Sequence, residues 1–179
     1  MNKPIYLTLS GVAMLAVGIT LLLSTSIGVG TSKILVPLFL FISGILAFIF
    51  SQVNGQHKVA KTFHMLQGMG LVSFAVLIAI WPDTLDMFLK LTTYFIMAYG
   101  LFEIVFAFSV LRSSFKVDKS ILMTRLVVGA VNLIGSFVLF MSLLKSTASG
   151  LTVAGFLIVL GGLGFIIFAN RIKKIDPSY

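Results

Sequence analysis

The sequence predicts an all-α polytopic membrane protein whose six transmembrane helices form three tandem helical hairpins. Of its 179 residues, 59% are hydrophobic and only 10% are charged, whereas a soluble domain is roughly half apolar and one quarter charged. Six apolar segments are each long enough to cross the ~30 Å hydrocarbon core of a bilayer. In addition, an apolar hairpin with one glycine in each arm occurs three times, at a period of roughly sixty residues.

The repeat is clearest in the second arm of each hairpin. Residues 43–51 (SGILAFIFS) align with 99–107 (YGLFEIVFA) and with 161–169 (GGLGFIIFA). Each segment contains a glycine, then an aliphatic residue, two variable positions, and a run that ends in Phe and a small residue. In the first arms the glycines recur in step, at Gly11, Gly68 and Gly129. The hairpins cover about 5–51, 63–111 and 121–170 of a single transmembrane domain, and a short basic tail follows at 171–179.

The spans are bounded by short connections that carry the turn and charged residues, at 24–33, 52–62, 112–120 and 145–150. The first span is too long for a signal peptide and lacks a cleavage site, so we expect it to be retained. The expected spans are Ile5 to Leu23, Ile34 to Ser51, Phe63 to Trp81, Thr84 to Leu111, Ile121 to Leu144 and Leu151 to Asn170.

The third and fourth spans meet at Trp81-Pro82-Asp83. The indole suits the membrane interface, proline stops the helix, and we expect Asp83 to cap the next one. The fourth span would be about 42 Å long at 1.5 Å per residue. It therefore tilts or extends beyond the hydrocarbon, with Lys90 reaching outward.

The basic residues fall mainly on one side of the membrane if the chain crosses it six times. The formal net charge is +8, and only Lys33, Lys90 and Lys145 would lie on the other side. By the positive-inside rule both termini are then cytoplasmic. We expect this charge to contact anionic lipid headgroups and not nucleic acid. The majority side holds Lys3, Lys58, Lys61, Arg112, Lys116, Lys119, Arg125, Arg171, Lys173 and Lys174.

Glu103 is the acidic residue that lies well inside a span, some eight residues from the cytoplasmic end and hence roughly 12 Å deep. Because a charge near a helix centre is costly in lipid, we expect it to face the bundle and to have a partner. Arg125 on the fifth span is the best partner, in a direct pair or in a network bridged by Asn132 on the same helical stripe. Gln67 on the third span lies at a similar depth.

Two interpretations of this polar group stay open. Glu103, Arg125, Asn132 and Gln67 either hold the helices together and fix their register, or form a small internal site in which Glu103 binds a proton or a cationic group. We expect no catalytic, cofactor or metal site. His57 and His64 lack nearby acidic or cysteine ligands and are expected in a loop or at the interface, and the chain has no cysteine. The glycine faces would serve internal packing or self-association, which leaves a homo-oligomer open.

The repeated hairpins, the Gly100 to Ala107 stretch and the span from Gly68 to Pro82 resemble the HdeD-like family of small bacterial membrane proteins over essentially the whole chain. The resemblance implies a six-span protein of the bacterial inner membrane, in a family named for acid resistance, and it implies no catalytic residues. Glu103 matches a glutamate often found after such a glycine, whereas Ala47 and Phe165 stand there in the other two hairpins.

From this resemblance we expect a non-enzymatic protein that contributes to envelope or acid-stress tolerance. The alternative is a small proton-linked transporter or channel whose polar site is centred on Glu103. A membrane enzyme is disfavoured because the sequence contains no catalytic constellation.

Overall fold

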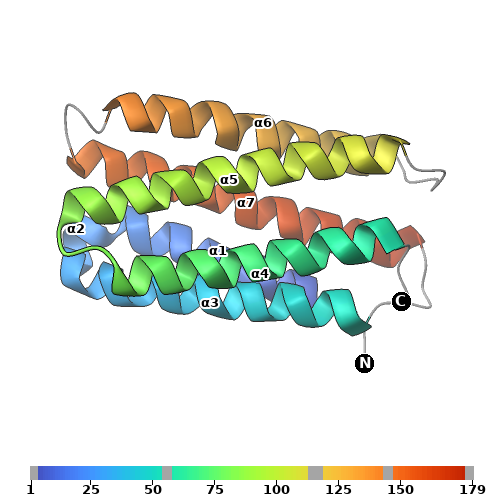
Figure 1. Ribbon diagram of the computed structural model, residues 1–179, viewed down its shortest axis with the longest axis horizontal. Coiled ribbons are helices and arrows are strands. Elements are labelled where there is room, and N and C mark those ends of the chain that lie inside the picture. The colour runs from blue at the N-terminus through green and yellow to red at the C-terminus, as the bar shows by residue number, and fades with distance from the viewer. Residues whose placement is uncertain (1–3, 54–57, 113–118, 143–146, 176–179) are drawn as a thin grey trace.

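The computed structural model describes residues 4–53, 58–112, 119–142 and 147–175, and the described chain is helical, without strands. Six of its helices are long and apolar enough to cross a membrane, so this is a multi-pass membrane protein. Figure 1 shows these six helices running side by side along one axis, as the three predicted hairpins require. The helices are α1 (Ile5–Leu22), α2 (Ser24–Ile27), α3 (Val29–Val53), α4 (Lys58–Ile80), α5 (Leu85–Arg112), α6 (Lys119–Ser142) and α7 (Thr147–Ile175).

The glycines of the repeat bring neighbouring hairpins into close contact. A Cβ atom added to Gly68 of α4 would lie 2.8 Å from the carbonyl oxygen of Gly44 in α3, and one added to Gly129 of α6 would lie 2.8 Å from that of Gly100 in α5. Only glycine allows two helix backbones to approach so closely. The first arm of each of these hairpins therefore packs against the second arm of the hairpin before it.

The same contact recurs between the first and last long helices and closes the bundle. A Cβ atom on Gly11 of α1 would lie 2.8 Å from the carbonyl oxygen of Gly162 in α7. Two turns further along α1, Gly18 makes an equally close contact with Gly155 of α7, and we call each such glycine–glycine contact a crossing. Successive long helices also pack against each other throughout the chain. The six long helices thus form a closed ring in chain order, with an approximate threefold repeat.

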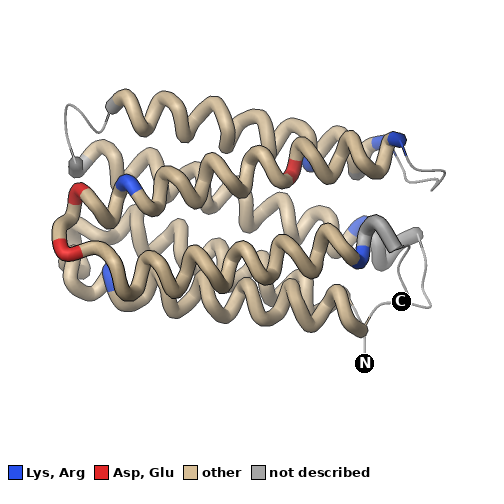
Figure 2. The backbone as a smooth tube through the Cα atoms, in the orientation of Figure 1, with Lys and Arg blue, Asp and Glu red and all other residues tan. Residues whose placement is uncertain are grey.

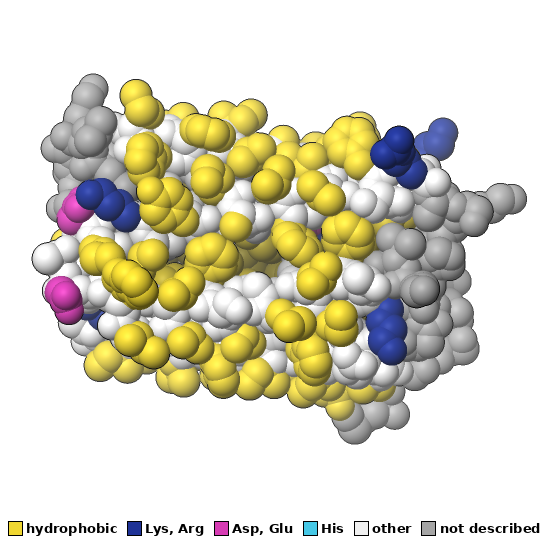
Figure 3. Space-filling view, in the orientation of Figure 1, with side chains coloured by type: hydrophobic (Ala, Val, Ile, Leu, Met, Phe, Trp, Pro, Cys, Tyr) yellow, Lys and Arg dark blue, Asp and Glu magenta, His cyan; other side chains and the backbone are white. Residues whose placement is uncertain are grey.

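The outer surface of the bundle suits contact with lipid. Large apolar side chains are exposed on all six long helices, for example Ile34, Ile80 and Ile134 at 69%, 78% and 65%, and they cover the face drawn in Figure 3. Most charged residues of the described chain gather at the two ends of the bundle (Figure 2). Glu103 and Arg125 are instead buried inside it.

Several details of the helices differ from the sequence predictions. The helix α4 begins at Lys58, inside the expected connection 52–62, and α7 begins at Thr147, inside the expected connection 145–150. The segment 24–33, expected as a connection, contains α2 and the first turn of α3, separated by Gly28 with φ +87°. Its Ser, Thr and Gly residues suggest a loop, but Ser32 donates its hydroxyl to the Gly28 carbonyl and stays helical. Thr84, not Asp83, caps α5, because its Oγ1 accepts the Met87 N–H at 3.2 Å. The helix α7 continues through residues 171–175 of the predicted tail, and 176–179 lie outside the described residues.

Candidate functional site

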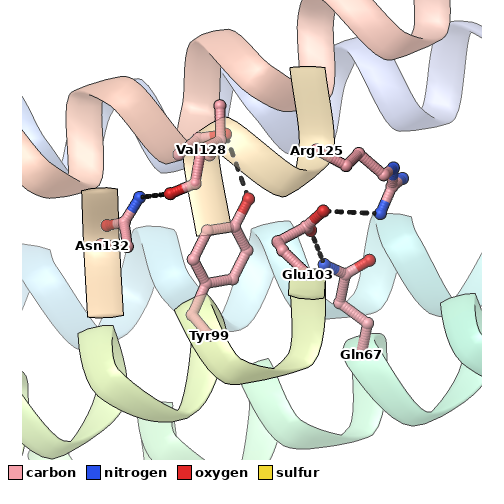
Figure 4. A network of polar contacts seen from close by, with 7 residues as sticks. Gln67, Tyr99, Glu103, Arg125, Val128 and Asn132 are labelled. Atoms are coloured by element: carbon pink, nitrogen blue, oxygen red, sulfur yellow. Dashed lines mark hydrogen bonds and ion pairs between the residues drawn. The ribbon is translucent and has the colours of Figure 1, made fainter. Parts of the chain in front are cut away.

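Glu103 lies at the centre of a buried polar network that joins three helices (Figure 4). The residue is 2% exposed. Its Oε2 accepts a hydrogen bond from Nη1 of Arg125 at 2.9 Å, and its Oε1 accepts one from Nε2 of Gln67 at 2.6 Å. Both carboxylate oxygens are therefore held, one from α6 and the other from α4.

The glycine contact between α5 and α6 explains why this pair forms. Gly100 lies three residues before Glu103, and a Cβ atom on Gly129 would lie only 2.9 Å from the Cβ of Glu103. Arg125 precedes Gly129 by one turn, so the close approach of the two helices brings the guanidinium beside the carboxylate. Charge-assisted hydrogen bonds of this kind are stronger than neutral ones.

The guanidinium of Arg125 is also enclosed by aromatic rings. Its central carbon lies 3.8 Å from the centroid of the Phe168 ring and 4.3 Å from that of Phe106, which are favourable cation–π distances. The side chain is 4% exposed. Nε and Nη2 have no hydrogen-bond partner in the described part of the protein. Only one of its three nitrogens is thus used by Glu103.

The prediction that His64 lies in a loop or at the interface is wrong. His64 is 1% exposed on α4, and its ring centroid lies 5.0 Å from that of Phe50 and 5.6 Å from those of Phe106 and Phe168. Neither ring nitrogen has a hydrogen-bond partner among the described residues. The imidazole ring of His64 is buried because it packs against these aromatic side chains as an apolar group would. His57 lies outside the described residues.

The three phenylalanines of this aromatic cluster are the same residue of the repeat. Phe50, Phe106 and Phe168 each lie six residues after the glycine of a second arm, and all three are buried. His64 and Arg125 are also equivalent to each other, because each lies four residues before the glycine of a first arm. The approximate threefold arrangement of the hairpins brings these positions together inside the bundle.

Asn132 does not join the network. Its Nδ2 donates to the Val128 carbonyl of its own helix at 2.9 Å, and its Oδ1 has no partner within the described residues. Asn132 follows Arg125 by two turns, about 10 Å along the axis, so the two side chains lie at different depths. Tyr99, which the sequence did not single out, donates its hydroxyl to the Gly161 carbonyl at 3.2 Å (Figure 4). It thereby connects α5 to α7, and its hydroxyl interacts electrostatically with Glu103 and Arg125.

A groove of about 170 Å³ opens between α4 and α5 on the face drawn in Figure 3. It is almost entirely apolar, and Gln67 lies in its wall, between the groove and Glu103. An added Cβ at Gly70 would meet no atom within 4 Å, so this glycine leaves the groove open. The lining residues are Leu66, Gln67, Gly70, Leu71, Phe74, Phe95, Ala98, Tyr99 and Phe102.

The polar groups of the site can hold charge and exchange protons. Among the described residues, no three His, Asp or Glu side chains lie close enough together to hold a metal ion. The ionisable groups of the described chain that lie around the Glu103–Arg125 pair include His64 and Tyr99. No protein-family model, curated protein or solved structure matches the chain.

Proposed function

We propose that this chain is a non-enzymatic protein of the bacterial cytoplasmic membrane, of the HdeD-like type, that contributes to envelope or acid-stress tolerance. The sequence resemblance described above supports the family and the cellular role. The single structural observation that supports a role in acid is the buried Glu103–Arg125 pair, which joins two hairpins. Protonation of the Glu103 carboxylate would leave Arg125 as an uncompensated cation inside the bundle, and such a charge strongly destabilises its surroundings.

The proposed orientation places both termini in the cytoplasm. Lys61, Arg112, Lys119 and Arg171 are at one end of the spans, and the helices that carry them begin or end there. Basic residues collect on the cytoplasmic side of membrane proteins, where they also attract anionic headgroups. Anionic lipids are therefore the partners that we propose for this end of the bundle.

The test is survival after acid challenge in a bacterial strain that lacks its own HdeD-like protein. Cells would carry an empty vector, the wild-type chain, Glu103→Gln or Asp86→Asn, at matched abundance in the membrane. Asp86→Asn is the control, because Asp86 forms an exposed pair with Lys90 at 2.7 Å. We expect the wild type and Asp86→Asn to protect and Glu103→Gln to fail. Absence of protection by the wild type would contradict the proposed role.

A second candidate function is a small proton-linked transporter or channel. The observation that favours it is that two buried side chains able to exchange protons lie beside the buried Arg125 cation. Glu103 is ion-paired with Arg125, and His64 packs on the same aromatic rings. Intramembrane ionisable residues often mark proton or ion pathways. Proteoliposomes with an internal pH dye would show proton flux that depends on Glu103 if this function holds, and no flux above that of empty liposomes if it does not.

A further inference from the structure

The free edge of the Arg125 guanidinium has the form of an anion-binding site. In an arginine side chain, the Nε–H and one N–H of Nη2 point side by side from one edge and match the two oxygens of a carboxylate. In this protein Glu103 is held by Nη1, so this two-pronged edge is not used for the ion pair. Both of its nitrogens are buried and have no hydrogen-bond partner in the described chain. Leaving such donors unsatisfied costs free energy that a ligand would recover.

His64 adds a second set of unpartnered nitrogens to the same place. His64 and Arg125 both pack against the rings of Phe106 and Phe168, so the two side chains share a common aromatic enclosure. Neither His64 nitrogen is hydrogen-bonded among the described residues. Four polar atoms from two helices, α4 and α6, therefore gather in the interior without a hydrogen bond of ordinary geometry among the described residues, although His64 interacts electrostatically with Gln67 and Arg125.

The charges around this enclosure set a condition on any anion that binds. Arg125 is already neutralised by Glu103 of α5. From α3 and α7 the enclosure receives Phe50 and Phe168, which carry no charge. Gln67 of α4 is neutral, and so is the phenol of Tyr99 of α5, which interacts with Glu103 and Arg125. An anion would thus add an uncompensated negative charge, which is costly in the interior. Protonation of His64 would supply the missing positive charge.

We propose that Arg125 and His64 form a site for a small monocarboxylate that is taken up together with a proton, in which the anion lies on the Nε–Nη2 edge and the proton resides on His64. A single guanidinium edge suits a monovalent two-oxygen anion, and the three phenyl rings suit a ligand with a small apolar group more than a hydrated dianion. This site goes beyond the proposed role in acid tolerance and does not depend on it.

The test is binding of sodium acetate to the purified full-length protein in lipid nanodiscs, followed by calorimetry, with sodium chloride at equal ionic strength as the reference. A pH series would run from about 8 down to about 4, which extends on both sides of the ordinary histidine pKa of about 6.5. We expect saturable binding that weakens as the pH rises, and net proton uptake on binding in a weakly buffered solution. Absence of saturable acetate binding throughout the series, or saturable binding of phosphate but not acetate, would overturn the proposal.

Three variants assign the roles. Arg125→Lys keeps the charge but lacks the two-pronged edge, and should weaken acetate binding about tenfold or more. His64→Gln should abolish proton uptake. Glu103→Gln frees the charge of Arg125, so acetate should then bind without proton uptake and at higher pH. Arg112→Gln, at an exposed basic residue, is the matched control and should leave binding unchanged.

Folding of each variant is checked by size-exclusion chromatography. If Arg125→Lys fails to fold, the loss of proton uptake in folded His64→Gln still decides the proposal, and proton uptake that persists in that variant would overturn it. Acetate binding that is equal in all the folded variants, or lost equally in Arg112→Gln, would show that acetate binds elsewhere. These outcomes are independent of the acid-survival experiment, because they concern binding by the isolated protein.

Discussion

His64 and Arg125 occupy the same position in two consecutive hairpins, four residues before the glycine of the first arm, and both side chains pack against Phe106 and Phe168. In the first hairpin this position is Leu7, which is fully buried. One structural position thus holds an aliphatic, an aromatic and a cationic side chain in the three hairpins. The repeated scaffold accepts this variety, and at this position of the repeat the polar side chains occur in two of the three copies.

The equivalence of His64 with Leu7 predicts that His64→Leu keeps the fold. Because both nitrogens of His64 are buried without partners among the described residues, we expect the substitution to raise the free energy of unfolding by about 1 kcal/mol. His64→Ala leaves a cavity and should lower it by about 2 kcal/mol. Reversible unfolding in detergent measures both values. An equal loss of stability in the two variants would show that the imidazole nitrogens contribute to folding.

The buried ion pair predicts strong coupling between Glu103 and Arg125. Each of Glu103→Gln and Arg125→Gln leaves the other charge buried without its partner, so each should lower the free energy of unfolding by about 3 kcal/mol. The double variant should lose less than the sum, with a coupling of about 1–3 kcal/mol. The same cycle at the exposed Asp86–Lys90 pair should give a coupling below about 1 kcal/mol. Equal coupling at the two pairs would contradict this prediction.

The glycine crossings predict a contrast between Gly129 and Gly70. A Cβ atom on Gly129 would clash with the backbone of Gly100 at 2.8 Å, so Gly129→Ala should lower the free energy of unfolding by about 1–3 kcal/mol. At Gly70 an added Cβ meets no atom within 4 Å, and alanine should be neutral or stabilise the helix by up to about 1 kcal/mol. Thermal unfolding of the two variants, side by side, is the measurement. A similar loss in both would mean that the crossings tolerate a side chain.

The distribution of basic residues predicts the orientation of the chain in cells. Because the native sequence has no cysteine, single cysteines can be introduced without further changes. Asp83 and Arg112 are both exposed and lie at opposite ends of the spans. In intact cells an impermeant maleimide should label Asp83→Cys, and it should label Arg112→Cys only after lysis. The reverse pattern would place the basic end outside.

Much of the architecture could be predicted from the sequence because hydropathy and the repeat are local properties. The glycines at 11, 68 and 129 and those of the second arms can be identified from their period alone. The glycine that each of them contacts cannot be identified in this way, because the period does not show which helices pack together. In the structure each contact joins one hairpin to the next, and Gly11 meets Gly162 from the far end of the chain.

The candidate site was predictable where two residues lie on neighbouring helices at a similar depth, as Glu103 and Arg125 do. Asn132 shares a helical stripe with Arg125 but lies two turns away, and a stripe does not fix depth. His64 was misplaced because a single histidine near the end of a span resembles an interfacial residue. The signal that identifies it is its alignment with Arg125 in the repeat.

The contact of α1 with α7 closes the ring, so the first and last long helices each have a neighbour on both sides. A circularly permuted chain that started at α4 and ended at α3, with α7 linked to α1, would cross the membrane six times and retain every helix contact of the ring. The native order of the hairpins therefore determines the order in which they enter the bilayer during synthesis. The helix contacts of the ring do not depend on which connection between hairpins is left open.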